Sequence, residues 1–387
     1  MRLLIVQYGG DYRKVFEQVR NRGIETYHAQ KYVVETVTEL SQKLEEVALL
    51  CCQTQQTYNE EVQPGLRVIG AGVEPYQNSR RVLEIIQAQQ PTHLVIHFPH
   101  EKMFRWGIQQ QVKILGLFAD SFLQRGWKRR LKNYTLARLL NHPQVDLVAN
   151  HGINACLSLQ QIGVNPNKII PWDFPHHRTP YMFPSKELKE LSINSRPLQL
   201  VYVGLIQKNK GVGDILTAVA KLGQFRPLSV KIAGGGEIEK FQRRAQALKI
   251  SEQVEFLGLI PQTQVIELMS TADAVIVPSW HEYPEGLPLT IYEALSTRTP
   301  IIASDHPMFR GNLIHRQNAM IFPERNPLQL AACIRELFTN PELYAQISLA
   351  TASAWENLQI PLKWGDLIQN WLYGVREDQT WFRDRLR

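Results

Sequence analysis

The stretch from residue 272 to residue 293 combines an apolar run, a glycine loop and a helix-like pattern, with carboxylates at Glu285 and Glu293. An apolar run over 272–277 predicts a buried strand, and a loop with Glu285 and Gly286 follows it. Pro288 suits the first position of a helix, because the N–H that proline lacks would have no partner there. Unpaired N–H groups at a helix start bind anions. This stretch therefore predicts an anion site.

The predicted helix places Thr290 and Glu293 three residues apart on one face. A rise of ~1.5 Å per residue separates them by about 4.5 Å along the axis, roughly the step from a phosphate to the neighbouring ribose. The Thr290 hydroxyl can donate to phosphate oxygens, and the Glu293 carboxylate can accept from both ribose hydroxyls. Glu285 lies just upstream, where a sugar on the distal phosphate would lie. We predict contacts to sugar, diphosphate and ribose in that order.

The string Glu285-Gly-Leu-Pro-Leu-Thr-Ile-Tyr-Glu293-Ala-Leu resembles the signature of retaining glycosyltransferase family 4, within glycosyl transferases group 1. The resemblance implies the α/β fold called GT-B. In this fold two Rossmann-like, doubly wound domains face a central cleft, and a C-terminal helix crosses back to the N-terminal domain. The alternative interpretation is a surface helix with two solvated carboxylates.

The composition favours a folded, cytoplasmic protein with an acidic partner. Hydrophobic residues make up 44% of the 387, and the formal net charge of +7 suits a nucleoside diphosphate, anionic lipid or nucleic acid. The four cysteines show neither metal-ligand spacing nor a disulfide framework. The apolar run at the N-terminus is too short for a signal peptide, and no run approaches ~20 apolar residues. We expect no metal and no cofactor.

Strand-like runs alternate with helical patterns in two successive blocks, which predicts two parallel sheets wrapped by helices. We expect an acceptor-binding domain at 1–178, a proline-punctuated linker at 179–197, a donor-binding domain at 198–360 and a crossover helix at 361–387. Strands are expected at 3–6, 47–52, 67–69, 92–98, 113–118, 145–149, 168–171, 198–203, 230–233, 254–257, 272–277, 300–303 and 320–322.

Glycine turns follow several of these strands, where a ligand can approach the backbone closely. Lys210-Gly211 resembles the family's Gly-Arg-Leu…Lys-Gly motif, whose two cations neutralise the donor diphosphate, but Leu205 stands at the arginine position. Lys208 and Arg310 are candidates to replace that arginine. The predicted donor-binding residues are Gly9, Gly10, Gly204, Lys208, Lys210, Gly234, Gly258, Leu259, His281, Glu285, Gly286, Leu287, Pro288, Leu289, Thr290 and Glu293.

Some of these residues have plainer interpretations. Lys210 could be a solvated loop lysine, Gly9-Gly10 an ordinary tight turn, and Gly234-Gly-Gly236 a flexible turn only. His281 either reaches the sugar or shapes its loop. A nicotinamide site has little support, because Gly211-Val-Gly213 lacks the third glycine of the dinucleotide fingerprint.

On the acceptor side, the family often has a histidine at a strand end where this sequence has Ala119. We therefore predict Asp120, the next residue, as the polar group near the reacting sugar, with His97 and His100 as alternatives. The predicted catalytic residues are Glu285, Asp120 and Lys210.

Residues 125–138 contain six cations and no carboxylate. Leu123, Trp127, Leu131 and Tyr134 could share one face of a helix there. Such a segment suits an anionic membrane surface, and the alternative is a helix packed on its own domain with a solvated basic face. Nucleic acid is not expected, since no recognition motif accompanies the cations. The predicted membrane patch is Arg125, Trp127, Lys128, Arg129, Arg130 and Lys132.

Together these features predict a metal-independent, retaining glycosyltransferase. It would move a hexose-type sugar from a UDP- or GDP-sugar to a lipid-linked, polysaccharide or other glycan acceptor, as the resemblance implies. It would be cytoplasmic, with peripheral attachment to the inner membrane face as a further expectation. One alternative is a GT-B protein that binds a sugar nucleotide or a membrane with weak or no transferase activity. The other is a GT-B sugar-nucleotide epimerase.

Overall fold

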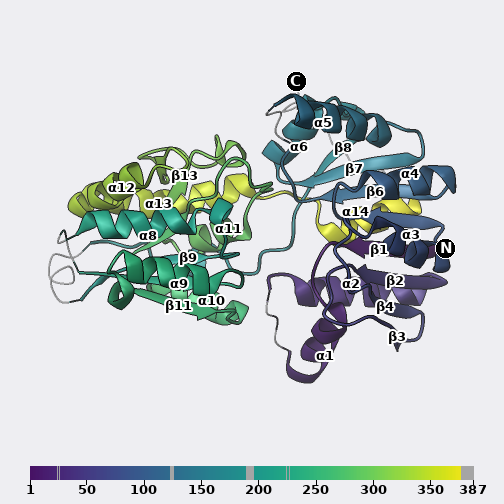
Figure 1. Cartoon of the computed structure of the whole chain (residues 1–387), viewed down its shortest axis with the longest axis horizontal. Helices are drawn as coiled ribbons and strands as arrows, with labels where there is room; N and C mark the ends of the chain where they lie inside the picture. Colours follow the sequence, from purple (N-terminus) through teal and green to yellow (C-terminus); the bar gives the residue numbers. More distant parts are fainter. Residues whose placement is uncertain are drawn as a thin grey trace. The chain divides into compact units, whose positions relative to one another are not determined.

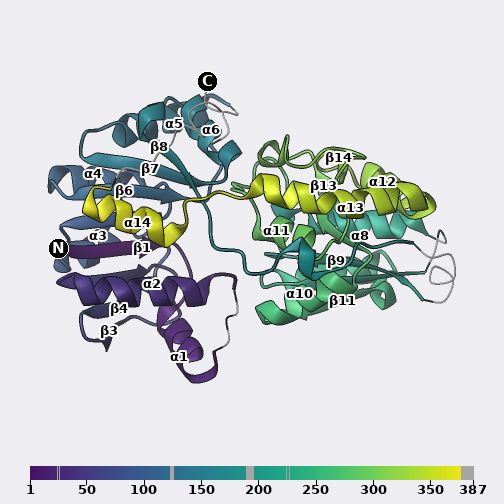
Figure 2. The ribbon, with the colours of Figure 1, turned by 180° about the vertical axis from the view of Figure 1, so that it is seen from behind.

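The computed structural model describes residues 1–23, 25, 27–122, 126–188, 196–223, 225 and 227–375. The chain forms two compact units, Met1–Pro175 with Ile360–Arg387 and His176–Gln359 (Figures 1 and 2). Within the described ranges, every helix is too short or too polar to cross a lipid bilayer.

The segment predicted as a separate linker, 179–197, packs on the second unit wherever it is described. The backbone N–H of Lys186 donates to the Ser348 hydroxyl at 2.7 Å. The Arg196 guanidinium makes two bonds of 2.7 Å to the Asp273 carboxylate. These contacts make the segment part of the second unit. The first unit ends at Pro175 rather than at 178, and the second unit begins at His176 rather than at 198.

The first unit contains an eight-stranded sheet in the order β3-β4-β2-β1-β5-β6-β7-β8. Its strands are β1 (Arg2–Gln7), β2 (Glu46–Cys51), β3 (Tyr58–Gln63), β4 (Leu66–Gly70), β5 (His93–Ile96), β6 (Lys113–Phe118), β7 (Val145–His151) and β8 (Ile169–Trp172). Its helices are α1 (Tyr12–Arg22), α2 (Gln30–Lys43), α3 (Ser79–Ala88), α4 (Glu101–Gln109), α5 (Trp127–Leu140), α6 (Ile153–Gln161) and α14 (Trp364–Tyr373), with a 3₁₀ turn at Pro166–Lys168.

Both faces of this sheet are buried. Leu3 and Ile5 of β1 pack in one hydrophobic cluster with residues of α1, α2 and α14, whereas Leu4 and Val6 pack in another with residues of α3, α4, α5 and α6. Side chains alternate between the faces of a strand, so a continuous apolar run fills both clusters. Such runs are typical of parallel strands covered by helices.

The sequence pattern missed β3, which pairs antiparallel with β4 at the edge of the sheet. Its central residues, Asn59, Glu60 and Glu61, are exposed. An edge strand without a buried face has no apolar alternation, and charged residues there prevent pairing with other chains. The prediction of an all-parallel sheet is therefore wrong at this one edge.

The C-terminal helix α14 returns to the first unit, as predicted, and lies beside α2 (Figure 2). Trp364 is fully buried, and its indole N–H donates to His97 Nε2 at 3.2 Å. The backbone N–H of Gly365 donates to the Tyr32 hydroxyl at 3.0 Å. These contacts fix the helix to the domain from which the chain started.

The second unit contains a six-stranded sheet that is parallel, as predicted, and its strand order is β11-β10-β9-β12-β13-β14. Its strands are β9 (Leu198–Val203), β10 (Leu228–Ala233), β11 (Val254–Gly258), β12 (Ala274–Val277), β13 (Ile301–Ser304) and β14 (Met320–Phe322). Its helices are α8 (Val212–Leu222), α9 (Ile238–Ala247), α10 (Gln262–Thr271), α11 (Leu289–Ser296), α12 (Pro327–Thr339) and α13 (Pro341–Leu358). The 3₁₀ turns are η2 (Pro180–Met182), η3 (Lys208–Lys210), η4 (Ser251–Gln253) and η5 (Pro307–Phe309).

The order of strands reverses at β9 in this sheet. The chain leaves β9 toward β10 and β11 on one side, and β12 then begins the opposite side. Ligands of open α/β sheets bind outside the carboxyl ends of the strands at such a point. The loops that follow β9 and β12 are therefore where the topology favours a site.

Candidate functional site

The loops that follow β9 and β12 are joined through their backbones. The N–H of Trp280 donates to the carbonyl of Asn209 at 2.8 Å. At Gly211 φ is 76°, and a Cβ there would lie 2.1 Å from the carbonyl oxygen of Pro278. Only glycine allows this approach. The close contact brings the Lys-Gly pair beside the loop that carries the first glutamate.

Lys210 and Glu285 form a buried ion pair in this position. Their exposed fractions are 9% and 7%, and the ammonium donates to Glu285 Oε1. The same oxygen accepts a bond of 2.6 Å from the Ser279 hydroxyl, and Lys210 Nζ lies 4.6 Å from the centre of the Tyr283 ring. Pairing compensates for the loss of water around both charges. The interpretation of Lys210 as a solvated lysine is wrong.

The start of α11 has no side-chain cap. Pro288 is the residue before the helix, with φ −60° and ψ 131°, rather than the first helical residue as predicted. The Thr290 hydroxyl donates to the carbonyl of Val203 at the end of β9, at 3.2 Å. The hydroxyl proton of Thr290 is thus directed at the end of β9 in this arrangement. The helix N–H groups, more than this hydroxyl, are the donors that an anion would find here.

Glu293 is also buried, with an exposed fraction of 9%. Its Oε1 accepts a bond of 2.6 Å from Gln262 Nε2 on α10. Burial raises the pKa of Glu293 to about 7, and the bond from Gln262 opposes that rise. With both glutamates buried, the interpretation of a surface helix with two solvated carboxylates is wrong.

The glycines after β10 are packed against the loop that follows β9. A Cβ on Gly234 would lie 1.8 Å from the carbonyl oxygen of Gly204, and one on Gly236 would lie 2.4 Å from that of Ile206. The N–H of Gly234 donates to the carbonyl of Gly258 at 2.8 Å. The glycine turn after β10 therefore packs closely against neighbouring backbone and is more than a flexible turn. Leu259, next along the chain, is 85% exposed.

His281 shapes its loop. Its Nε2 lies 2.8 Å from Asp305 Oδ1, and its Nδ1 lies 3.0 Å from Glu324 Oε1. The side chain is buried. Both ring nitrogens face carboxylates, so the structure does not support the prediction that this side chain contacts a sugar.

The Trp280 ring carries two cations, an arrangement that no sequence pattern predicted. Leu205 is 44% exposed, and the Trp280 ring carries Arg325 at 4.3 Å and Lys208 at 5.7 Å from its centre. The Trp280 indole N–H donates to Asp214 Oδ2 at 2.7 Å. Trp280 and Arg325 lie in separate loops that meet only in the folded chain. No motif spacing in the sequence could therefore have indicated their contact.

Two predicted donor residues, Gly9 and Gly10, lie in the first unit at the end of β1. At Gly10 φ is 91°, and a Cβ on Gly9 would meet no atom within 4 Å. A side chain at Gly9 would therefore meet no steric obstacle, and the predicted donor contact of this turn stays a prediction. The other predicted donor residues lie in the second unit.

Asp120 lies at the end of β6, partly buried, beside the exposed Ala119. Its backbone N–H donates to Asn150 Oδ1 at 3.2 Å, and Asn150 Nδ2 donates to its carbonyl at 2.8 Å. Asn150 is fully buried and fixes this strand end.

His97 and His100 hold the fold of the first unit. His100 Nδ1 accepts from the N–H of Met103 at the start of α4, and its Nε2 lies 3.2 Å from the Ser79 hydroxyl. His97 accepts from the indole of Trp364, and burial lowers its pKa to about 3. Because both histidines bond to groups of their own unit, Asp120 remains the predicted polar group near the reacting sugar.

The predicted membrane patch lies on α5, apart from Arg125, which is outside the described residues along with Leu123. Trp127, Leu131 and Tyr134 are 72%, 60% and 59% exposed. The opposite side of the helix, with Leu136 and Leu140, is buried. Lys128, Arg129, Arg130 and Lys132 are all exposed.

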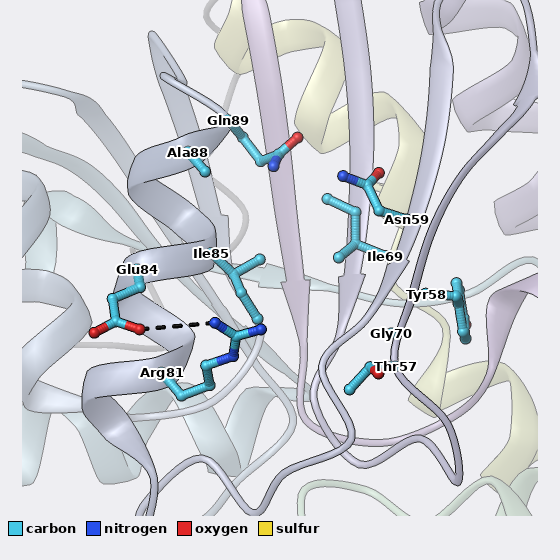
Figure 3. A pocket seen from close by; sticks show the side chains of 10 residues that line it. All are labelled: Thr57, Tyr58, Asn59, Ile69, Gly70, Arg81, Glu84, Ile85, Ala88 and Gln89. Atoms are coloured by element: carbon cyan, nitrogen blue, oxygen red, sulfur yellow. Dashed lines mark ion pairs between the residues drawn. The ribbon is translucent and has the colours of Figure 1, made fainter.

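Figure 3 shows a separate hollow of about 380 Å³ at the edge of the first sheet, between α3 and the β3–β4 hairpin. Arg81 and Glu84 form an ion pair of 3.8 Å beside it. No predicted site residue lines this hollow, and its two charged residues neutralise each other. Among the described residues, no group of three or more His, Cys, Asp or Glu is arranged to hold a metal ion.

Residues 185–353 match the family model described as glycosyl transferases group 1. The chain is 29% identical over 147 residues to glycogen synthase of Mycobacterium tuberculosis, and 37% identical over 125 residues to D-inositol 3-phosphate glycosyltransferase of Corynebacterium jeikeium. These matches cover 38% and 30% of this chain, and 35% and 29% of the relatives. The chain thus spans about a third of the length of these relatives.

Solved structures extend the likeness in fold to both units. Sucrose-phosphate synthase from Thermosynechococcus elongatus superimposes with a TM-score of 0.71 at 16% identity, over 97% of this chain and 98% of that one. HepE from Anabaena, in complex with UDP, superimposes with a TM-score of 0.66 at 12% identity, over 97% and 100%. The chain has the GT-B fold, and residues 185–353 within its second unit are similar to glycosyl transferases group 1.

Proposed function

We propose that this protein is a glycosyltransferase that takes a sugar from a nucleoside diphosphate sugar. The observation that carries the proposal is the buried Lys210–Glu285 pair beside the uncapped start of α11. A cation, free helix amides and a carboxylate are the groups that a diphosphate and its sugar require. A protein of the same fold, HepE, has been solved in complex with UDP-glucose.

We assign the charged groups in order along the donor. Glu285 holds hydroxyls of the donor sugar and stabilises the oxocarbenium-like state. Lys210, which is paired with Glu285, gains a diphosphate oxygen as a further partner and neutralises the charge that develops on the leaving group. Glu293 accepts from the ribose. Fixed cations and helix amides do this without a metal ion, and turnover should therefore survive chelation by EDTA.

The transfer retains the anomeric configuration. The bond between the anomeric carbon and the phosphate oxygen breaks, and a bond from the acceptor oxygen forms on the same face of the sugar. The acceptor hydroxyl proton passes to the leaving phosphate oxygen. We assign Asp120 as the polar group near the reacting sugar. Replacing Asp120 by Asn should lower turnover without changing the affinity for the nucleoside diphosphate.

The acceptor is a lipid-linked or polysaccharide glycan that receives a hexose. Supporting this class is α5, whose exposed Trp127, Leu131 and Tyr134 share the helix with several cations and no carboxylate. Aromatic side chains suit the interfacial region of a bilayer, and cations suit anionic headgroups. We propose that α5 lies on an anionic membrane surface and brings the enzyme to its acceptor.

A panel of UDP-glucose, UDP-galactose, GDP-mannose and ADP-glucose tests the function, with and without membrane extract. Release of nucleoside diphosphate that depends on the extract supports glycosyl transfer. Conversion of a donor without any acceptor would instead support the epimerase alternative.

The binding-protein alternative keeps one specific observation in its favour, the exposed leucine at position 205 where the related motif has arginine. A missing bidentate phosphate contact lowers stabilisation of the leaving group. If nucleoside diphosphates bind but no donor is consumed with any extract, this alternative is correct and the transferase proposal is wrong.

A further inference from the structure

The hollow of about 380 Å³ at the edge of the first sheet has both apolar and polar lining residues. Ile69 of β4 is buried on the side of the sheet, and Ile85 of α3 is partly buried on the side of the helix. The carboxamides of Asn59 and Gln89 extend toward one another across the hollow (Figure 3). Its volume lies within the ~300–1,000 Å³ that is typical of sites for small ligands.

The two carboxamides keep hydrogen-bonding groups for a ligand. Among the residues that the structure describes, the Gln89 side chain has no hydrogen-bond partner. The Asn59 side chain bonds through its oxygen alone, which accepts from Arg67 at 3.2 Å. A carboxamide offers both donors and an acceptor, and so does each hydroxyl of a sugar. The pair therefore suits a ligand with several hydroxyl groups.

The charges of the lining favour a neutral ligand. Its two charged residues are one cation and one anion, Arg81 and Glu84, which lie 3.8 Å apart. A phosphate would therefore have to displace Glu84 from its partner. A purely apolar ligand would cover the carboxamides without bonding to them, and an unpaired polar group costs free energy. A glycan avoids both penalties, because it combines neutral hydroxyls with apolar C–H faces.

The hollow begins at the edge of the sheet where the parallel strands end. β4, β2, β1, β5 and β6 all run in one direction, so Gly70 at the end of β4 and Asp120 after β6 lie at the same edge. Opposite Gly70, the Tyr58 hydroxyl donates to Asp11 Oδ1 at 2.6 Å, directly after the glycine turn of β1. From there the hollow follows α3 to Gln89 at its C-terminal end.

We propose that this hollow is a subsite for a neutral glycan, and that it holds sugars distant from the reacting end of the acceptor. The inference rests on the proposed function and deepens it, because it requires an acceptor of several sugars. Four strand spacings of ~4.8 Å separate β6 from β4, roughly 19 Å, so a single sugar near Asp120 cannot reach the hollow. Asn59 and Gln89 bond to hydroxyls of the distant sugars, and the two isoleucines pack against their C–H faces.

Affinity electrophoresis of the whole protein through gels that contain dextran, glycogen, mannan or a β-glucan tests the inference without any donor. We expect at least one of these neutral glycans to retard the wild-type protein. Asn59→Ala combined with Gln89→Ala should raise the Kd for that glycan roughly tenfold, because two hydrogen bonds are lost. Gln87→Ala, exposed on the same helix and outside the hollow, is the matched control and should migrate as the wild type does.

Ala88→Trp provides a second variant at an exposed position of the lining. The larger ring fills the hollow without removing either carboxamide and should abolish most of the retardation. Retardation by none of the glycans, or equal retardation of the wild type and both folded variants, would overturn the inference and leave the transferase proposal intact. If both variants lose glycan binding but the wild type consumes no donor of the nucleotide panel, the acceptor role and the proposed function are both overturned.

Discussion

The two units share a parallel sheet and strand-end loops, yet they use polar residues differently. In the second unit Lys210, Glu285 and Glu293 are buried near an uncapped helix start. Their carboxylates accept from the Lys210 ammonium, the Ser279 hydroxyl and the Gln262 amide. In the first unit, the buried Asn150 and His100 side chains form hydrogen bonds with backbone groups and a hydroxyl. The named residues of the second unit are therefore charged side chains that contact other side chains, whereas the named residues of the first unit bond mainly to the backbone and fix it.

The sharpest test of this difference is Glu285→Ala. We expect kcat for donor turnover to fall roughly 10²–10³-fold, as for removal of a group that stabilises developing charge. Release of nucleoside diphosphate measures this. Glu282→Gln, an exposed carboxylate on the same loop, is the matched control. An equal loss in both variants would show that the loop, rather than the buried carboxylate, matters.

The charged form of Glu293 should lower the free energy of unfolding at neutral and higher pH. Its folded-state pKa of about 7 lies above the ordinary 4.5, so the stabilisation of its neutral form is complete below pH 4.5 and is lost as pH rises through 7. Glu293→Gln should therefore raise the free energy of unfolding by roughly 1–3 kcal/mol at pH 8 and change it little at pH 4.5.

Urea unfolding at the two pH values measures this effect. Glu267→Gln, an exposed residue on α10, provides the control and should change neither value. A Glu293→Gln variant that gains no stability at pH 8 would contradict the raised pKa.

Removing the cations of α5 should weaken the proposed binding of the protein to anionic membranes. It should leave the affinity for nucleotides unchanged. Each basic residue near an anionic surface contributes about 1 kcal/mol before screening, so replacing Lys128, Arg129 and Arg130 by Gln should weaken liposome binding at least about tenfold. Flotation with phosphatidylserine vesicles measures it.

A triple variant with Gln at Lys43, Lys102 and Lys113, all exposed in the same unit, has the same net charge and should still float. If both triple variants detach equally, net charge rather than α5 is responsible.

The smallest effect is expected at His97. Replacing it by Ala leaves the buried Trp364 indole N–H without its acceptor and should lower the free energy of unfolding by about 1–2 kcal/mol. Affinity for nucleoside diphosphates should not change. Thermal unfolding and calorimetry test the two halves of this prediction, and loss of nucleotide binding in a folded variant would show that His97 has a role beyond stability.

Local patterns in the sequence predicted most of the fold. Apolar runs such as 113–118 and 198–203 coincide with strands, because a strand buried on both faces needs hydrophobic residues at every position. The edge strand β3 was not predicted for the same reason, because its exposed residues need not be hydrophobic. The glutamate string near α11 was visible because its members follow one another along a single loop and helix.

Only the tertiary structure decided which charges meet. Lys210 and Glu285 are 75 residues apart and Gln262 and Glu293 are 31 apart, and no periodicity connects either pair. Their contacts exist because parallel strands bring the loops at their carboxyl ends to one edge of the sheet. The sequence by itself determined the elements and the kind of chemistry, through local burial and spacing. Burial, pairing and the direction of each polar group came from packing between distant segments.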